Sequence, residues 1–124
     1  MTDTKPWRMI VRGAFTEAWM NAPQAEKNEV FAAWTGAHAK WVGMGAEMIA
    51  TLDDELSMVG VPRGRGWNFY SIWTIPDPTI VLQLLNLFRV EDAGTIRLDK
   101  YFTFETVVGH PIGGLERRVL AASE

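Results

Sequence analysis

The feature that most constrains the fold is the stretch GWNFYSIWTIPDP at positions 66–78. Aromatic and β-branched residues favour strands, and the flanking glycine and Pro-Asp-Pro are typical of strand ends. Alternate side chains of a strand point to opposite faces. One set is almost wholly apolar and the other is mixed: Trp67, Phe69, Ser71, Trp73 and Ile75 against Asn68, Tyr70, Ile72 and Thr74. We predict a central strand that needs cover on both faces.

Three further strands are predicted from similar patterns. Residues 7–15 place Trp7, Met9, Val11 and Phe15 on one face and Arg8, Ile10 and Arg12 on the other. Residues 46–52 form a less regular candidate. Residues 95–108 predict one long strand with two sets of alternating side chains: Ile96, Leu98, Phe102 and Phe104 against Arg97, Asp99, Tyr101, Thr103 and Glu105.

Two helices are predicted from capping signals. The first has Asn21 as N-cap, Pro23 in the first turn and Gln24 at the capping-box position, and it runs to about Val42. The second starts at Asp77-Pro78 and runs to about residue 92. Its apolar residues surround most of the helix, so we predict that it is covered on more than one side. A turn at 109–114 and a short helix at 115–120 would form a C-terminal arm, residues 110–124.

Composition limits the organisation and the partners. The 124 residues suit one domain, 1–124, with a real core. A net charge of −3 with 22% charged residues gives no field that would attract nucleic acid or an anionic membrane. The chain has no cysteine, which excludes disulfides and thiolate chemistry, and the sequence shows no signal-peptide pattern or membrane-spanning stretch. We expect a cytoplasmic protein with a neutral or weakly polar partner.

The predicted order of strand, helix, strand, strand, helix, strand is the ferredoxin-like βαββαβ plan, an α+β fold with two helices on one face of a four-stranded antiparallel sheet. The helices would cover the large rings and aliphatic side chains Trp7, Met9, Val11, Trp67, Phe69, Trp73, Phe102 and Phe104. The reverse face would be amphipathic, with Arg8, Arg12, Asn68, Tyr70, Ile72, Tyr101, Thr103 and Glu105. Because Ile10, Ile72 and Tyr70 share that face with charges, we predict that two copies pair through it as a homodimer.

From residue 7 to 108, the element order and the aromatic placement resemble the dimeric α+β-barrel superfamily. The segments KPWRMIV at 5–11 and FTFETVVGHP at 102–111 are also similar to the small barrel proteins of bacterial indole-3-acetic acid catabolic clusters. The resemblance implies paired sheets and a place among cofactor-independent monooxygenases, muconolactone isomerases, haem-degrading monooxygenases or stress-response barrels. Fold alone does not choose between them, since some members have no known chemistry.

His38 is the main candidate for chemistry. Helical spacing places it with Trp34 and Trp41, and strand spacing places Trp67, Phe69 and Trp73 beneath that helix face. These rings would line a pocket for a small, flat aromatic ligand, in which His38 moves a proton and Asn68 or Tyr70 polarises a carbonyl. The alternative is that the rings interlock and His38 is a core residue.

Metal and cofactor chemistry are poorly supported by the sequence. Neither His38 nor His110 has a ligand partner at helical i, i+4 spacing. The haem-degrading branch uses an Asn, a Trp and a His, but Trp67 and Asn68 are adjacent and point to opposite faces unless a bulge intervenes. We predict no metal and no cofactor.

Two short charged segments are interpreted as solvated turns. Asp53, Asp54 and Glu55 form an acidic turn rather than a catalytic pair. Arg63 and Arg65 in PRGRG lie at a hairpin tip, with anion binding as the less favoured alternative because the full phosphate-loop pattern is missing.

Two functions from different classes therefore remain. The first is a cofactor-independent enzyme of monooxygenase or isomerase type acting on a small aromatic compound. The second is a non-catalytic dimeric binding or accessory protein of an aromatic catabolic pathway.

Overall fold

The computed structural model describes residues 7–53, 67–89 and 96–122. Its elements are β1 (Trp7–Phe15), α1 (Glu17–Met20), α2 (Gln24–Gly43), β2 (Glu47–Asp53), β3 (Phe69–Ile75), a 3-10 turn η1 (Pro78–Ile80), α3 (Val81–Arg89), α4 (Leu98–Tyr101), β4 (Phe102–Gly109) and α5 (Leu115–Ala122). The predicted charged segments at 54–55 and 62–66 lie outside the described residues.

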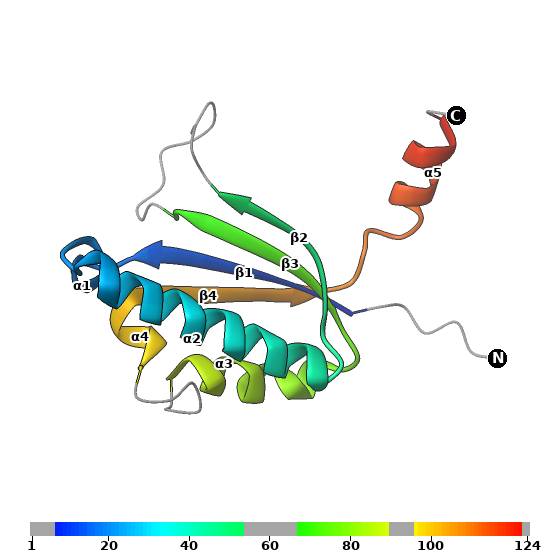
Figure 1. The fold of residues 1–124 in the computed structure, drawn as a ribbon. Helices are drawn as coiled ribbons and strands as arrows, with labels where there is room; N and C mark the ends of the chain where they lie inside the picture. Colours follow the sequence, from blue (N-terminus) through cyan, green and yellow to red (C-terminus); the bar gives the residue numbers. More distant parts are fainter. Residues whose placement is uncertain (1–6, 54–66, 90–95, 123–124) are drawn as a thin grey trace.

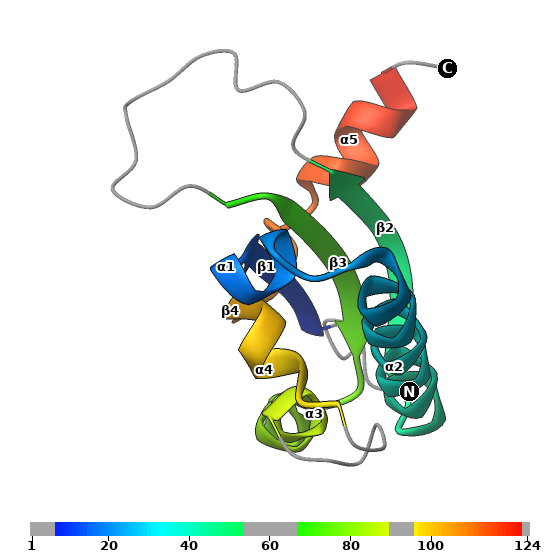
Figure 2. The same cartoon turned by 60° about the vertical axis from the view of Figure 1, so that its left-hand side comes forward.

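The four strands form one sheet in the order β2-β3-β1-β4, and every neighbouring pair is antiparallel. Helices α2 and α3 lie side by side against the same face of the sheet (Figure 1), and the view from the side in Figure 2 shows both on that one side. The predicted α+β fold with a four-stranded antiparallel sheet is confirmed. No helix in the described ranges is long and apolar enough to cross a membrane.

The core lies between the sheet and these helices, as the strand alternation predicts. Met9 and Val11 of β1 and Trp73 of β3 are buried, whereas Ile10 between them is exposed on the reverse face. The helices and the second half of the chain complete the core with Val30, Ala33, Ala37, Trp41, Leu84, Phe88, Leu98, Tyr101 and Phe102. The face assignment of β1 and β3 therefore follows from their period-2 pattern.

A β-bulge in β2 changes the direction of its second half. Met48 pairs with Trp73, but the next pair is Ala50 with Ile72, so one extra residue is inserted on β2. An extra residue reverses the side-chain parity beyond it. As a result Thr51 and Asp53 lie on the same face of the sheet as Met48, the face covered by the helices.

Two of the predicted elements are corrected. The long strand at 95–108 is broken, because residues 98–101 form α4 and only 102–109 form β4. Leu98 and Tyr101 are both buried on this helical turn, and the Tyr101 hydroxyl donates a 2.6 Å hydrogen bond to Glu26 of α2, so Tyr101 is not on the reverse face. The hydrogen-bonded carboxylate raises the pKa of Tyr101 to about 12.

The start of the first long helix also differs from prediction. Asn21 ends the short helix α1, and Pro23 occupies the N-cap of α2 without a side-chain hydrogen bond. At the second predicted helix the cap is correct, because the Asp77 side chain accepts the N–H of Thr79 at 2.8 Å. That bond lowers the pKa of Asp77.

Within one protomer α3 is covered by α2, by α4 and by β4, where Phe88 contacts Phe104, and it keeps one exposed side. Leu84 and Phe88 are buried, but Leu82 is exposed. Helix α5, which ends the predicted arm, does not supply the missing cover, because it projects beyond the end of the sheet (Figure 1) and has no buried residue. Several elements of the protomer therefore cover α3, but the predicted arm is not one of them.

Candidate functional site

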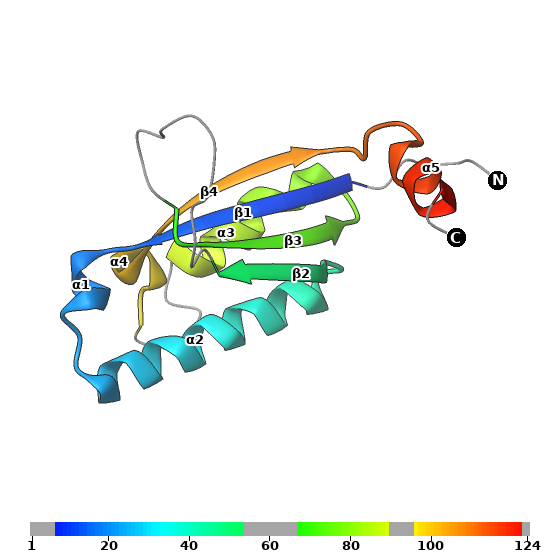
Figure 3. The ribbon, with the colours of Figure 1, turned by 90° about the horizontal axis from the view of Figure 1, so that it is seen from above.

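A cavity of about 510 Å³ lies between α2, the α1 end of the molecule, and strands β2 and β3. Figure 3 shows β2 as the outermost strand, running beside α2. Six phenylalanine and tryptophan side chains line the cavity: Phe15, Trp19, Phe31, Trp34, Phe69 and Phe102. The other lining residues are Thr35, His38, Met48, Thr51, Leu52, Asp53, Tyr70 and Ser71. This is an aromatic cavity with a few polar side chains, the usual make-up of a small-molecule site.

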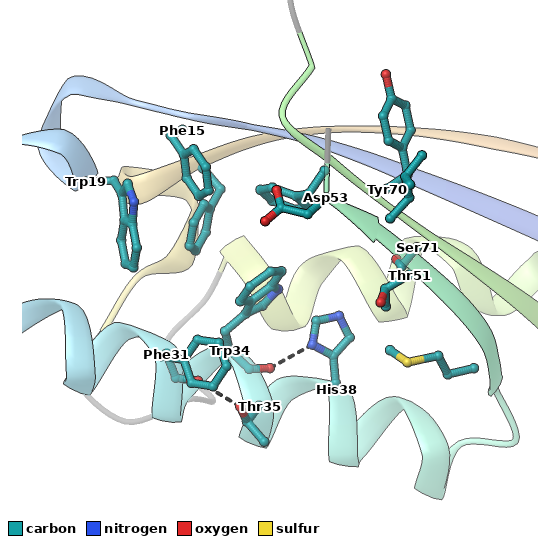
Figure 4. Close-up of a pocket in the computed structure, with 14 residues that line it drawn as sticks. Phe15, Trp19, Phe31, Trp34, Thr35, His38, Thr51, Asp53, Tyr70 and Ser71 are labelled. Carbon is teal, nitrogen blue, oxygen red and sulfur yellow. Dashed lines mark hydrogen bonds between the residues drawn. The ribbon is translucent and has the colours of Figure 1, made fainter. Parts of the chain in front are cut away.

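His38 is held in one orientation by its own helix. Its Nδ1 lies 2.9 Å from the carbonyl oxygen of Trp34, one turn earlier in α2 (Figure 4). A carbonyl oxygen only accepts, so Nδ1 carries the hydrogen and Nε2 keeps its lone pair. Within the described residues Nε2 has no hydrogen-bond partner. It is therefore an available acceptor on the wall of the cavity.

The surroundings of His38 keep it neutral. Its ring stacks on Trp73 with centroids 5.4 Å apart, and the rings of Trp41 and Phe88 meet it edge-on at 5.0 and 5.3 Å. Burial among these rings lowers the pKa of His38 to about 4, although the hydrogen bond to the Trp34 carbonyl acts in the opposite direction. At neutral pH the imidazole accepts a hydrogen bond without carrying charge.

Trp34 forms the wall beside His38. Its ring lies 5.0 Å from Phe69 and 5.0 Å from Phe102. Its Nε1–H is buried and has no hydrogen-bond partner among the residues that the structure describes. A buried donor left unpaired costs about 1–3 kcal/mol, so the ring packing must offset that cost.

Asp53 reaches the cavity because of the bulge in β2. Without the inserted residue, positions 51 and 53 would share a face with residues 47 and 49 rather than with Met48. Asp53 pairs with Phe69, and Figure 4 shows its carboxylate turned toward the rings of Phe15 and Trp34. The cavity thus has an anionic group at the β2 end and the neutral His38 on α2.

Gly13 provides the space in which the Phe69 ring lies. Gly13 and Phe69 are directly paired across β1 and β3. A Cβ atom on Gly13 would be 2.1 Å from Cζ of Phe69, far inside the contact limit. The absence of a side chain at position 13 therefore leaves room for the Phe69 ring, which forms one wall of the cavity.

The structure brings together only part of the predicted site. His38, Trp34 and Phe69 line the cavity as the helix and strand spacing predict. Trp41 and Trp73 do not line it, because both are fully buried and pack against each other at 5.0 Å. Their indole N–H groups are used internally: Trp41 donates to the Leu84 carbonyl and Trp73 donates to Ser71 Oγ, both at 2.8 Å.

Three other predicted site residues lie at the β3 end. The Arg12 guanidinium lies 5.6 Å from the centre of the Trp67 ring, and Trp67 does not contribute to the cavity. The Asn68 side chain accepts the backbone N–H of Phe15 at 2.8 Å, which joins two strands. Tyr70 borders the cavity, but its hydroxyl points away from His38 (Figure 4). In this arrangement neither Asn68 nor Tyr70 faces the Nε2 of His38.

Sequence reasoning did not assign several lining residues to the site, among them Phe15, Trp19, Thr51 and Asp53. The alternation of side chains along β1 places Phe15 on the helix-covered face, so its position could have been predicted from the sequence. Thr51 and Asp53 depend on the bulge, which no sequence pattern indicated. His110 is outside the cavity and packs on Trp7 with ring centroids 3.8 Å apart. Among the described residues, no three His, Asp or Glu side chains are grouped so as to hold a metal ion.

Fold and site together define an α+β protein with an aromatic cavity under its first long helix. Neither protein-family models nor curated proteins match the sequence. Among solved structures, the chain is similar to a protein of unknown function from Rhodopseudomonas palustris, with a TM-score of 0.55 and 16% identity over 87% of this chain and 83% of that one. At this identity the similarity concerns the fold alone.

Proposed function

We propose that the chain is a ferredoxin-like protomer of the dimeric α+β-barrel class. The strand order β2-β3-β1-β4 with all pairs antiparallel supports this, as do the two helical crossovers, α2 between β1 and β2 and α3 between β3 and β4. Both crossover helices cover one face, which leaves the reverse face of the sheet to a second copy.

The reverse face has the chemistry of a contact between two sheets. Ile10 is directly opposite Ile72 on one side and Val107 on the other, which gives an apolar row across three strands. Arg12 and Glu105 pair beside this row, and Arg8 pairs with Glu116 of α5. Ile10 and Val107 are exposed in the protomer. A second copy of the same face would bury the apolar row and keep the ion pairs at its border.

We expect the protein to be a homodimer in solution. Light scattering at micromolar concentration should give twice the protomer mass of 13.9 kDa. Ile10→Lys, in the centre of the row, should shift the mass toward the protomer because it places a charge in the contact. Ala39→Lys, on an exposed position of α2, is the matched control and should stay dimeric. A wild-type protein of protomer mass would contradict the dimer.

We propose that the cavity binds a small, flat aromatic molecule that carries an N–H or O–H donor. The observation that carries the proposal is the oriented, uncharged acceptor His38 Nε2 in a cavity lined mainly by aromatic rings. Rings that stack on a flat ligand supply affinity, and one oriented acceptor supplies specificity. The resemblance to small barrel proteins of aromatic catabolism supports cytoplasmic catabolism of aromatic compounds as the setting and indole-type rings as the first ligands to test.

The test uses the hydrogen bond itself. Isothermal titration calorimetry should show that wild type prefers indole to 1-methylindole, whose ring nitrogen has no hydrogen. His38→Phe keeps a ring against Trp73 but removes Nε2, so it should erase that preference. We expect a wild-type preference of about three- to tenfold, the value of one hydrogen bond.

The comparison forms a double-mutant cycle, which separates the hydrogen bond from general effects on packing. Thr35→Val is the matched control, because Thr35 lines the cavity on the same helix but donates to the carbonyl of Phe31. That variant should keep the wild-type preference. If His38→Phe also keeps it, His38 is not the acceptor.

A second candidate function is a cofactor-independent enzyme of isomerase or monooxygenase type. The observation that favours it is the fixed tautomer, since a histidine held through Nδ1–H presents Nε2 to a ligand as a base does. The low pKa means that proton transfer would need negative charge to develop on the ligand at the same time. Product formation with an aromatic substrate, reduced about 100-fold in His38→Phe, would favour catalysis over binding alone.

A further inference from the structure

The formal charge in the lining of the cavity is negative. Asp53 is the one acidic lining residue, and no Lys or Arg is found among the lining residues that the structure describes. His38, which also lines the cavity, is neutral at pH 7 because burial lowers its pKa. A ligand in the cavity therefore meets a negative charge at one end and no positive charge from these walls.

The aromatic walls act in the same direction. The face of an aromatic ring is electron-rich, so ring-lined cavities attract cations, by about 0.5–2 kcal/mol for each well-placed ring. Asp53 turns its carboxylate toward Phe15 and Trp34 (Figure 4), so rings and carboxylate border the same space. An ammonium group placed there would be surrounded by two kinds of favourable electrostatic contact, whereas a carboxylate would meet two unfavourable ones.

The two ends of the cavity therefore suit two parts of one ligand. His38 Nε2 accepts from a donor on the aromatic ring, and Asp53 lies on the opposing strand β2. The volume of about 510 Å³ is enough for a bicyclic ring with a short side chain. From this arrangement, and resting on the proposed function, we infer that the ligand is an aromatic amine whose positively charged amino group binds at Asp53.

Three probes of the same ring and different charge test the inference. These are tryptamine (cation), 3-methylindole (neutral) and indole-3-acetate (anion), titrated at pH 7 and physiological salt. Tryptamine should bind about tenfold more tightly than 3-methylindole, and indole-3-acetate should bind most weakly. Raising the salt concentration should reduce the advantage of tryptamine, because Asp53 is exposed.

Two variants locate the effect. Asp53→Asn should remove most of the advantage of tryptamine and leave 3-methylindole unchanged. Glu47→Gln removes the same charge from the same strand, but Glu47 does not line the cavity, so the order of the three ligands should remain. Equal or tighter binding of indole-3-acetate would overturn the inference, as would a tryptamine affinity that Asp53→Asn does not change. If 3-methylindole binds without any preference for the amine, the charge inference alone fails; if none of the three binds, the proposed function fails with it.

Discussion

Leu84→Asp is expected to unfold the protein. Leu84 is completely buried in α3, and its carbonyl oxygen accepts the indole N–H of Trp41. The substitution removes buried apolar volume and places an unpaired carboxylate in the core, which together should cost at least about 4 kcal/mol. That is most of the stability of a domain at the low end of the usual range of about 5–15 kcal/mol. Circular dichroism should show loss of the cooperative thermal transition.

The matched control lies two residues away on the same helix. Leu82 is 63% exposed, so Leu82→Asp introduces the same charge without burying it. Its unfolding free energy should stay within about 0.5 kcal/mol of wild type. If Leu84→Asp melts like Leu82→Asp, the packing of α3 against α2 described above is wrong.

The protein should lose stability between pH 6.5 and 4 through His38. The ordinary pKa of 6.5 applies to the unfolded chain, and burial lowers the folded value to about 4. Between these two values the unfolded state binds a proton that the folded state does not, so a falling pH favours unfolding. Above pH 6.5 the side chain is neutral in both states and this effect is absent. The total loss should approach about 3 kcal/mol by pH 4, and about 2 kcal/mol of it should be present at pH 5.

Urea unfolding of wild type and His38→Phe at pH 7.5 and pH 5 isolates this contribution. Phenylalanine cannot take up a proton, and both proteins have the same carboxylates, including Asp53 beside the cavity. The difference in unfolding free energy between them should therefore shift by about 2 kcal/mol in favour of the variant at pH 5. The same pH dependence in both proteins would show that His38 is solvated rather than buried among Trp41, Trp73 and Phe88.

Much of the sheet was predictable because its two central strands follow the simplest rule. The inward-facing side chains of β1 and β3 are mostly apolar, and the buried residues Met9, Val11 and Trp73 are on the side that the pattern predicts. The same rule wrongly predicted a strand at residues 95–101. Leu98 and Tyr101 are spaced as in a helix, but the residues around them alternate in polarity as in a strand. On this helical turn Tyr101 donates a hydrogen bond to Glu26, which is distant in sequence. A local sequence pattern cannot predict such a contact.

The cavity was only partly predictable for a similar reason. Helical spacing is enough to place Trp34 and His38 on one face of α2. Whether Trp41 and Trp73 line a cavity or fill the core depends on Phe88, which stacks on Trp41 at 4.7 Å and comes from a different helix. Asp53 depends on one inserted residue in β2. Volumes and register shifts of this kind are properties of the assembled structure rather than of a sequence segment.

The pairing of Gly13 with Phe69 has a consequence for how the site can vary. Even a methyl group at position 13 would displace the Phe69 ring, which is part of the cavity wall. Position 13 is therefore coupled to the shape of the cavity although it touches no ligand. Homologues with a different residue there should also differ at position 69, so the two positions would change together in evolution as a single unit that controls ligand size.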